Sequence, residues 1–118
     1  MTVEDYVREI VVRGLHDWIQ AMEVRGVLQW RGVTAHDEIR NLTLAIVRAV
    51  LEQELMTIGT FVQGQFTEWQ VPVEQALARV AREWDALGDL PGMGDLFWLS
   101  NTEKGDQRGR EWQAEETS

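Results

Sequence analysis

The chain has 118 residues, 20 of them acidic and 11 basic, which gives a formal net charge of −9. This length is typical of one compact domain whose core supports folding without covalent cross-links. The absence of cysteine excludes disulfides, thiolate metal sites and cysteine nucleophiles. The negative charge disfavours nucleic-acid binding, which lysine and arginine normally drive, and it favours either a basic partner or simply solubility.

The first residues predict a cytoplasmic protein. Glu4, Asp5 and Glu9 stand among the apolar residues there, and the basic and continuously apolar regions of a secretory signal are missing. Charges also interrupt every longer apolar run, so we expect no segment that spans a bilayer.

A first helix is predicted from about residue 3 to 25. Thr2 and Asp5 have the spacing of a capping box, and apolar residues recur behind them at helical spacing. Gly14 marks a point where this helix can break. Gly26 suits a C-terminal cap, because glycine adopts a positive φ without steric cost.

The strongest helical pattern comes next, after a short connection. Residues 27–33 form a short segment with an aromatic side chain, which is typical of a minor strand or of a connector that lays Trp30 over the core. Thr34 and Asp37 then repeat the capping-box spacing ahead of a helix predicted at 35–56. That helix is apolar over more than half of its circumference, so we expect neighbouring elements on several of its sides.

A hairpin and a further helix are predicted in the second half of the chain. Residues 57–62 alternate like a strand, and Gln63-Gly64 is typical of the turn of a hairpin. Pro72 suits the first turn of a helix at 72–87, and Gly88 supplies its end.

The apolar run from Leu96 to Leu99 predicts a last strand at 96–100. Because alternate side chains face opposite ways, Phe97 and Leu99 share one face, and Leu96 and Trp98 share the other. Such a run is typical either of a strand buried on both faces or of an apolar surface for a partner.

These elements predict an α+β fold, a helix-rich single domain of three main helices with a small antiparallel sheet. We expect Ile46 and Trp84 to be buried in it. The globular domain is predicted to cover residues 1–105. Residues 106–118 are polar with a lone Trp112, and they predict a disordered tail.

No pattern of catalytic or metal-binding residues stands out. His16 and His36 lie on different predicted helices, and neither has a second histidine four positions on, as a helical zinc pair requires. Ser100 and Ser118 lack a nucleophile elbow. The glycines of residues 88–94 have neither the Walker lysine nor dinucleotide-binding spacing. We therefore expect no enzyme, no cofactor and no bound metal.

The order of the elements and the closing letters FWLSNTEKG resemble a winged-helix domain, in which a wing strand often leads into an L-T-x-x-G segment. Here Ser100 and Asn101 interrupt that segment, and the helix predicted at 35–56 lacks an arginine-rich recognition face. The same ending resembles small acidic uncharacterised bacterial proteins that close with a W-[FL]-x-N-T-x-x-G pattern. This resemblance covers about a dozen residues well, and it implies a family without implying an activity.

One functional hypothesis is a non-enzymatic acidic binding module of the immunity-protein or antitoxin kind. Its negative surface would steer it onto a basic partner protein, such as a nuclease toxin. The predicted partner-binding residues are Asp89, Asp95, Trp98 and Glu103. In this hypothesis Trp98 is the aromatic anchor, and the carboxylates form an acidic rim around it.

Two further hypotheses stay open. The chain resembles a winged-helix-like nucleic-acid-binding regulator, which would use Arg8, Arg13, Arg25 and Arg31. At net charge −9, however, we expect no measurable affinity for duplex DNA at physiological salt. A structural subunit of a larger assembly is the third hypothesis.

Overall fold

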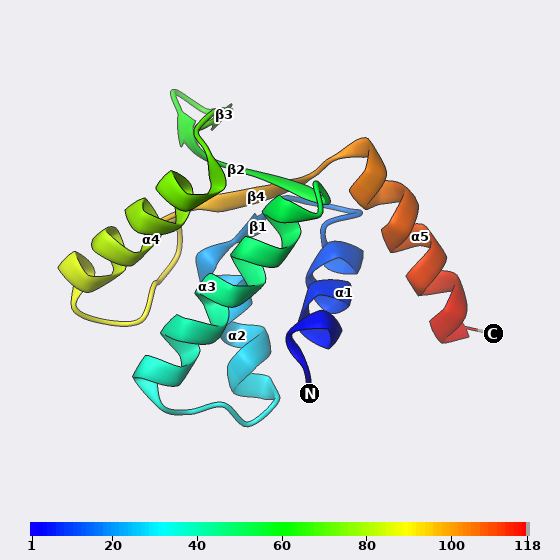
Figure 1. The fold of residues 1–118 in the computed structure, drawn as a ribbon, viewed down its shortest axis with the longest axis horizontal. Helices are drawn as coiled ribbons and strands as arrows, with labels where there is room; N and C mark the ends of the chain where they lie inside the picture. The colour runs from blue at the N-terminus through cyan, green and yellow to red at the C-terminus, as the bar shows by residue number, and fades with distance from the viewer. Residues whose placement is uncertain (118) are drawn as a thin grey trace.

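The computed structural model describes residues 1–117, which form five helices and one four-stranded sheet (Figure 1). The helices are α1 (Val3–Arg13), α2 (Ala21–Trp30), α3 (His36–Glu52), α4 (Val73–Leu87) and α5 (Glu103–Thr117). The strands are β1 (Ile19–Gln20), β2 (Met56–Val62), β3 (Gln65–Glu68) and β4 (Trp98–Asn101). These elements confirm the predicted α+β class.

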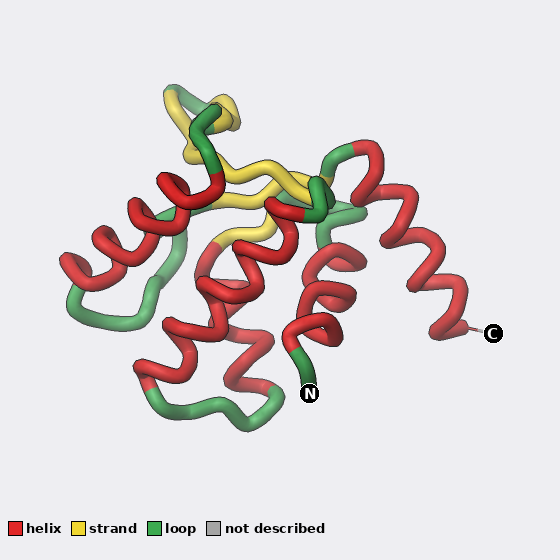
Figure 2. Tube along the Cα trace, viewed as in Figure 1, coloured by secondary structure: helices red, strands yellow, loops and turns green. Residues whose placement is uncertain are grey.

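The strands form one sheet in the order β1-β4-β2-β3, and all neighbouring strands are antiparallel. The helices lie on one side of the sheet, and its other side carries no helix (Figure 2). The apolar core fills the space between the helices and the sheet. None of the helices in residues 1–117 has the length and apolar character needed to cross a bilayer.

The single helix predicted at 3–25 is wrong, because the structure divides this segment into α1 and α2. α1 begins with the predicted capping box, in which the Thr2 hydroxyl accepts a hydrogen bond from the Asp5 N–H at 3.2 Å. It ends at Gly14, and residues 19–20 pair with β4 as strand β1. Pairing with a strand that lies far along the chain therefore overrides the helical spacing of the apolar residues.

The last turn of α2 replaces the strand or connector predicted at 27–33. Gly26 lies inside this helix and not at its C-terminal cap. Trp30 is 78% exposed and does not lie over the core. At the start of α2, the Glu23 carboxylate accepts a hydrogen bond from the Gln20 N–H at 3.5 Å, so the helix starts directly after β1.

Helix α3 is central to the fold, as its apolar circumference predicts. It contacts α1, α2, α4 and β2, and its Ile46 is fully buried as expected. The capping box predicted at Thr34 and Asp37 does not form. The helix begins at His36 after Ala35, which has no side chain to cap it.

The hairpin of β2 and β3 and the helix α4 are confirmed. The hairpin turns at residues 63–64, as predicted. Gly88 ends α4 with a φ of 72°, a left-handed conformation that costs glycine little. Trp84 of α4 is buried as predicted, and its indole N–H donates to His36 Nε2 at 3.0 Å.

The apolar run before residue 100 is core on one face only. Phe97 and Leu99 are fully buried against the helices. Trp98 points to the other side of the sheet and is half-buried. The alternation holds from Phe97 to Leu99, but the predicted start of the strand is wrong: β4 begins at Trp98, and Leu96 has a φ of 68° and packs against the core instead of sharing a face with Trp98.

The disordered tail predicted from residue 106 is wrong, because residues 103–117 form helix α5. Trp112 is only 3% exposed, and the guanidinium groups of Arg8 and Arg108 lie 5.3 and 4.8 Å from the centre of its ring. Gly105 allows close approach, since a Cβ there would overlap the carbonyl oxygen of Leu55. One buried tryptophan and one close backbone contact therefore attach a helix whose composition is mostly polar.

Three residues before and inside α5 fasten it to the rest of the fold, and we call Asn101, Thr102 and Gly105 the α5 clasp. The Thr102 hydroxyl accepts a hydrogen bond from the Gly105 N–H at 3.0 Å and donates to the Glu54 carbonyl at 2.6 Å. The Asn101 amide donates to the Val11 carbonyl of α1 at 3.0 Å. The N-T-x-x-G part of the closing pattern therefore has a structural role here.

Candidate functional site

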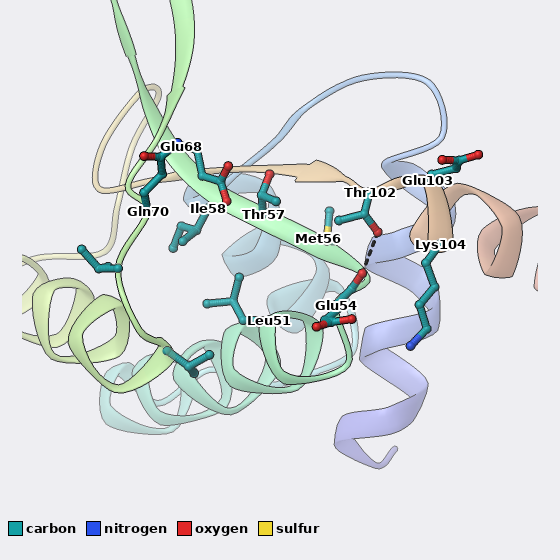
Figure 3. Close-up of a pocket in the computed structure, with 12 residues that line it drawn as sticks. Leu51, Glu54, Met56, Thr57, Ile58, Glu68, Gln70, Thr102, Glu103 and Lys104 are labelled. Atoms are coloured by element: carbon teal, nitrogen blue, oxygen red, sulfur yellow. Dashed lines mark hydrogen bonds between the residues drawn. The ribbon is translucent and has the colours of Figure 1, made fainter.

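A groove opens beside β2, where the end of α3 and the starts of α4 and α5 meet (Figure 3). Its volume is about 490 Å³. The apolar residues that line it are Leu51, Met56, Ile58, Val71 and Val73. The charged residues that line it are Glu54, Glu68, Glu103 and Lys104. We call this hollow the β2 groove.

Two sharp turns of the chain build the β2 groove. After α3 ends, the backbone turns at Glu54 with a φ of 58°, and the α5 clasp holds that turn through the bond from Thr102 to its carbonyl. After β3, the backbone turns at Gln70 with a φ of 52° and leaves β2 for α4. The groove is the space between these two turns, beside the first residues of β2.

The charged side chains of the β2 groove are available to a ligand. In the part of the chain that is described, the side chains of Glu54, Glu68, Glu103 and Lys104 make no hydrogen bond or ion pair. The residues that line the groove therefore include three carboxylates and one ammonium group. Figure 3 shows Glu68 at one end of the groove and Glu54 at the other with Lys104 beside it, while the carboxylate of Glu103 points outward.

The side of the sheet without helices carries a second feature, a cluster of four rings that we call the aromatic face. It consists of Trp18, Phe61, Phe66 and Trp98. The ring of Phe61 lies 5.1 Å from Trp18 and 5.0 Å from Trp98, centre to centre, in edge-to-face geometry. These contacts bury much of each ring, yet Trp18 remains 41% exposed.

The four residues predicted to bind a partner do not line one pocket. Glu103 lines the β2 groove, and Trp98 belongs to the aromatic face. Asp95 accepts a hydrogen bond from the Gly92 N–H at 2.8 Å within the loop before β4. Asp89 accepts one from the N–H of the residue after it at 2.7 Å. The two aspartates thus shape their loop, and Glu103 is the predicted residue that the β2 groove includes.

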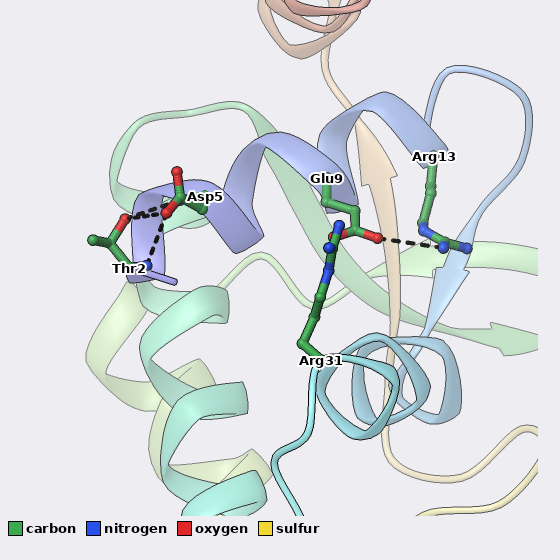
Figure 4. Close-up of polar contacts among 5 residues, drawn as sticks. All are labelled: Thr2, Asp5, Glu9, Arg13 and Arg31. Carbon is green, nitrogen blue, oxygen red and sulfur yellow. Dashed lines mark hydrogen bonds and ion pairs between the residues drawn. The ribbon is translucent and has the colours of Figure 1, made fainter. Parts of the chain in front are cut away.

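The nucleic-acid hypothesis depends on Arg8, Arg13, Arg25 and Arg31. Arg13 and Arg31 both pair with the Glu9 carboxylate, at 3.4 and 3.2 Å (Figure 4). Arg25 donates to the Pro91 carbonyl at 2.9 Å, and Arg8 lies over the ring of Trp112. All four guanidinium groups are thus engaged within the fold, so they do not form a free basic surface.

The two histidines have different surroundings, and His16 lines a shallow hollow together with Asp17 and Asp106. His36 accepts the indole hydrogen bond of Trp84, and His16 is exposed in the loop before β1. Among residues 1–117, no three side chains of the His, Asp or Glu type come together as ligands of a metal ion.

Two carboxyl groups on the helices have lowered pKa values. Hydrogen bonds from the Thr2 backbone N–H and hydroxyl lower the pKa of Asp5 from its usual value of 3.8 (Figure 4). A hydrogen bond from Arg48, together with its positive charge, lowers the pKa of Glu74 from 4.5. Both groups are exposed, and they stabilise helix ends and helix contacts rather than the groove.

Comparison with other proteins does not assign the chain to a family. No protein-family model matches it, and neither the curated proteins nor the solved structures gave a significant match. The resemblances to winged-helix domains and to acidic bacterial proteins therefore stay predictions. The candidate site depends on the geometry of the chain itself.

Sequence reasoning missed most of the β2 groove. Glu54 lies inside the helix predicted at 35–56, although α3 ends at Glu52, and Glu68 lies in the second half of the predicted hairpin, so each had an ordinary local explanation. The turn of the chain at Gln70 is what brings Glu54 and Glu68 to the same groove. A pair of acidic residues at the ends of elements that flank one strand was the available signal.

Proposed function

We propose that this protein is a non-enzymatic binding module that holds a basic partner protein, as immunity proteins and antitoxins do. The observation that carries this proposal is the β2 groove, whose apolar wall lies beside three carboxylates without partners in the described chain. The composition of an apolar centre with a charged rim suits a protein interface. The net charge of −9 favours the approach of a basic protein by long-range attraction.

The test is a comparison of partner capture by two variants with the same change in charge. The groove variant carries Glu54→Gln, Glu68→Gln and Glu103→Gln. The control variant carries Glu4→Gln, Glu38→Gln and Glu116→Gln, three exposed glutamates outside the groove. The wild type and each variant are immobilised on a support and incubated with an extract of the cells that make the protein. The bound proteins are then quantified by mass spectrometry.

We expect a basic protein that binds the wild type and the control variant, is released by salt, and is lost from the groove variant. Equal loss from both variants would show that only the overall charge matters. If no basic protein distinguishes the wild type from the groove variant, the proposed function is wrong.

The aromatic face favours the hypothesis of a structural subunit as a second candidate. Trp98 of this face points away from the side of β4 on which Leu99 is buried, and Trp18 is 41% exposed. Exposed apolar surface of this kind is typical of an interface between subunits. A Trp18→Ala variant that loses the partners retained by the groove variant would favour this candidate.

The nucleic-acid hypothesis has less support, because the arginines on which it depends are paired within the chain. A bound phosphate would have to compete with Glu9 for two of them. Salt-dependent binding of the purified protein to duplex DNA would restore this hypothesis.

A further inference from the structure

We propose that the aromatic face and the hollow beside Trp18 bind the guanidinium group of an arginine side chain that a partner protein presents. This inference goes beyond the proposed function, because it assigns a ligand to a second surface and does not depend on the β2 groove. It is argued from an exposed ring of fixed orientation, from two carboxylates that each keep an oxygen free within the described chain, and from the charge of the hollow.

The hollow lies where three segments meet, namely the loop after α1, the end of β4 and the first turn of α5 (Figure 1). Its volume is about 310 Å³. It is lined by residues 14–18 of the loop, Ser100 and Asn101 of β4, and Asp106 of α5. Ser100 shares the face of β4 that carries Trp98, because alternate residues of a strand face the same way. The hollow therefore adjoins the aromatic face, and we call it the Trp18 hollow because Trp18 belongs to both.

The ring of Trp18 is held in place by the aromatic face. Phe61 meets it edge-to-face at 5.1 Å between ring centres, and Phe66 stacks on it at 6.5 Å with the two planes 20° apart. Trp18 nevertheless stays 41% exposed. The face of an indole ring attracts cations, and arginine stacks on it more often than lysine does. The chain itself contains this contact, since the Arg79 guanidinium lies 3.9 Å from the centre of the Trp69 ring.

Two carboxylates line the Trp18 hollow, and the fold holds each through one of its oxygens. Asp17 Oδ1 accepts a hydrogen bond from the Trp18 N–H at 2.8 Å, and Asp106 Oδ1 accepts one from the Asn101 amide at 3.0 Å. The Oδ2 atom of each has no hydrogen-bond partner in the described part of the chain. The forked donors of a guanidinium group match such oxygens, and bonds of this charged kind are stronger than neutral ones. Both carboxylates are therefore oriented and still able to accept from a ligand.

The charge of the Trp18 hollow calls for a cation from outside. Among the described residues, no lysine or arginine lines it, and its ionisable side chains are one histidine and the two aspartates. The Glu9 carboxylate shows the contrast, because it pairs with both Arg13 and Arg31 at 3.4 and 3.2 Å. A ligand that brings its own positive charge therefore complements the hollow.

The same chemistry decides between the possible occupants. A second copy of this chain also carries a net charge of −9, and like charges oppose association. Lysine presents a compact and strongly hydrated ammonium group, whereas the planar guanidinium group can stack on a ring and donate to carboxylates at its edge. We therefore assign the Trp18 hollow to an arginine side chain of a partner protein.

The experiment titrates the full-length, isotope-labelled protein with three capped amino acids and follows it by NMR. The probes are the N-acetyl, N-methylamide forms of arginine, lysine and citrulline, of which citrulline has the shape of arginine without its charge. We expect the arginine probe to shift the Trp18 indole signal with a dissociation constant on the order of 1 mM. Citrulline should bind at least about tenfold more weakly, and lysine about threefold more weakly. The amides of residues 102–104 report on the β2 groove.

A pair of variants with the same change in charge locates the site. One carries Asp17→Asn and Asp106→Asn, which keep the Oδ1 acceptors. The matched pair is Asp37→Asn with Asp89→Asn, because Asp89 accepts from the next N–H at 2.7 Å as Asp17 does, and Asp37 lies in a first helical turn as Asp106 does. We expect about fivefold weaker arginine binding for the first variant, and no more than about a 1.5-fold change for the matched one.

A change of the ring tests the aromatic contact separately. Trp18→Leu keeps an apolar side chain but has no ring on which a guanidinium group can stack. We expect it to bind the arginine probe about threefold more weakly than the wild type. The Trp98 indole signal and the melting temperature show whether this variant keeps its fold.

Several results would overturn this inference. Equal binding of arginine and citrulline would show that charge is not recognised, and equal binding of lysine would remove the assignment to arginine. Equal losses in the two aspartate variants, or shifts confined to residues 102–104, would place the cation elsewhere. Dimerisation that is seen by sedimentation and lost in Trp18→Leu would make a second copy the occupant, and absence of binding would leave no site. The proposed function would survive each of these results, because the groove variant and its control retain Trp18, Asp17 and Asp106.

Discussion

The α5 clasp and the β2 groove share the segment that joins β4 to α5, yet they treat polar groups in opposite ways. In the clasp, the Thr102 hydroxyl makes two hydrogen bonds and Gly105 permits backbone contact. In the groove, the side chains of Glu103 and Lys104 make no hydrogen bond or ion pair within the described chain. Neighbouring positions thus have separate roles. The clasp residues stabilise the fold, and the groove residues leave their charged side chains unpaired within the described chain.

This difference shows that a short sequence pattern can indicate a structural motif, whereas a candidate site need not have such a pattern. The closing letters of the chain contain the clasp residues, so in this chain they serve to attach α5. The groove is built from residues of several elements that no single pattern contains. A structural motif and a candidate site can therefore lie side by side without sharing their residues.

The largest expected effect comes from removing the buried ring of α5. We expect Trp112→Ala to lower the free energy of unfolding by about 3–5 kcal/mol, because it leaves a cavity between α1 and α5. Chemical denaturation monitored by circular dichroism measures this change. An unchanged midpoint would mean that α5 contributes nothing to stability, as a disordered tail would.

A matched pair of helical glycines tests the close contact in the clasp. In Gly105→Ala the new Cβ overlaps the Leu55 carbonyl oxygen, and we expect a loss of roughly 1–3 kcal/mol. In Gly26→Ala the new Cβ meets nothing within 4 Å inside α2. We expect that variant to gain about 0.5–1 kcal/mol from helix propensity. Thermal unfolding of both variants measures these changes in stability. A gain in stability in both variants would contradict the close contact at Gly105.

The hydroxyl of Thr102 is the next smaller contribution. Its removal in Thr102→Ala deprives the first turn of α5 of its cap and the Glu54 carbonyl of its donor. We expect a loss of about 0.5–2 kcal/mol by equilibrium denaturation. Thr102→Ser keeps the hydroxyl and should recover most of the stability, whereas equal losses would assign the effect to the methyl group.

The cap of α1 should produce the smallest effect on stability, and one that depends on pH. The folded protein holds the pKa of Asp5 below its usual value of 3.8, so its contribution is present above that pH and is lost as the pH falls through the folded pKa. The wild type should therefore melt higher than Asp5→Asn at neutral pH, and the difference should shrink below about pH 4. A difference that is constant with pH would contradict this account.

Much of the fold could be predicted because local chemistry determines it. The capping box at Thr2, the hairpin turn at residues 63–64 and the end of α4 at Gly88 all depend on a few consecutive residues. The break between α1 and α2 and the helix α5 depend on long-range partners. Gly14 marked the possible break, and α1 does end there. The pairing of β1 with β4 and the burial of Trp112 against α1 have no local pattern, because their partners lie far along the chain.

The candidate site was less predictable for the same reason. Glu103 was predicted as a partner-binding residue from its place after the last strand, and it lines the β2 groove, while its role in binding stays a prediction. Asp89 and Asp95 looked equivalent to it in sequence, but their carboxylates accept backbone hydrogen bonds in their own loop. Which carboxylates remain unpaired is decided by the three-dimensional fold and not by their spacing.

The central claim is that the β2 groove, and not the overall charge, binds a basic partner protein. The most direct test is the affinity of the captured basic protein for the wild type, the groove variant and the control variant, measured by calorimetry at one salt concentration. Three surface charge contacts of about 0.5 kcal/mol each predict binding about tenfold weaker for the groove variant. The control variant should stay within about twofold of the wild type, because its charges lie outside the groove. Equal affinities for the two variants would contradict the claim.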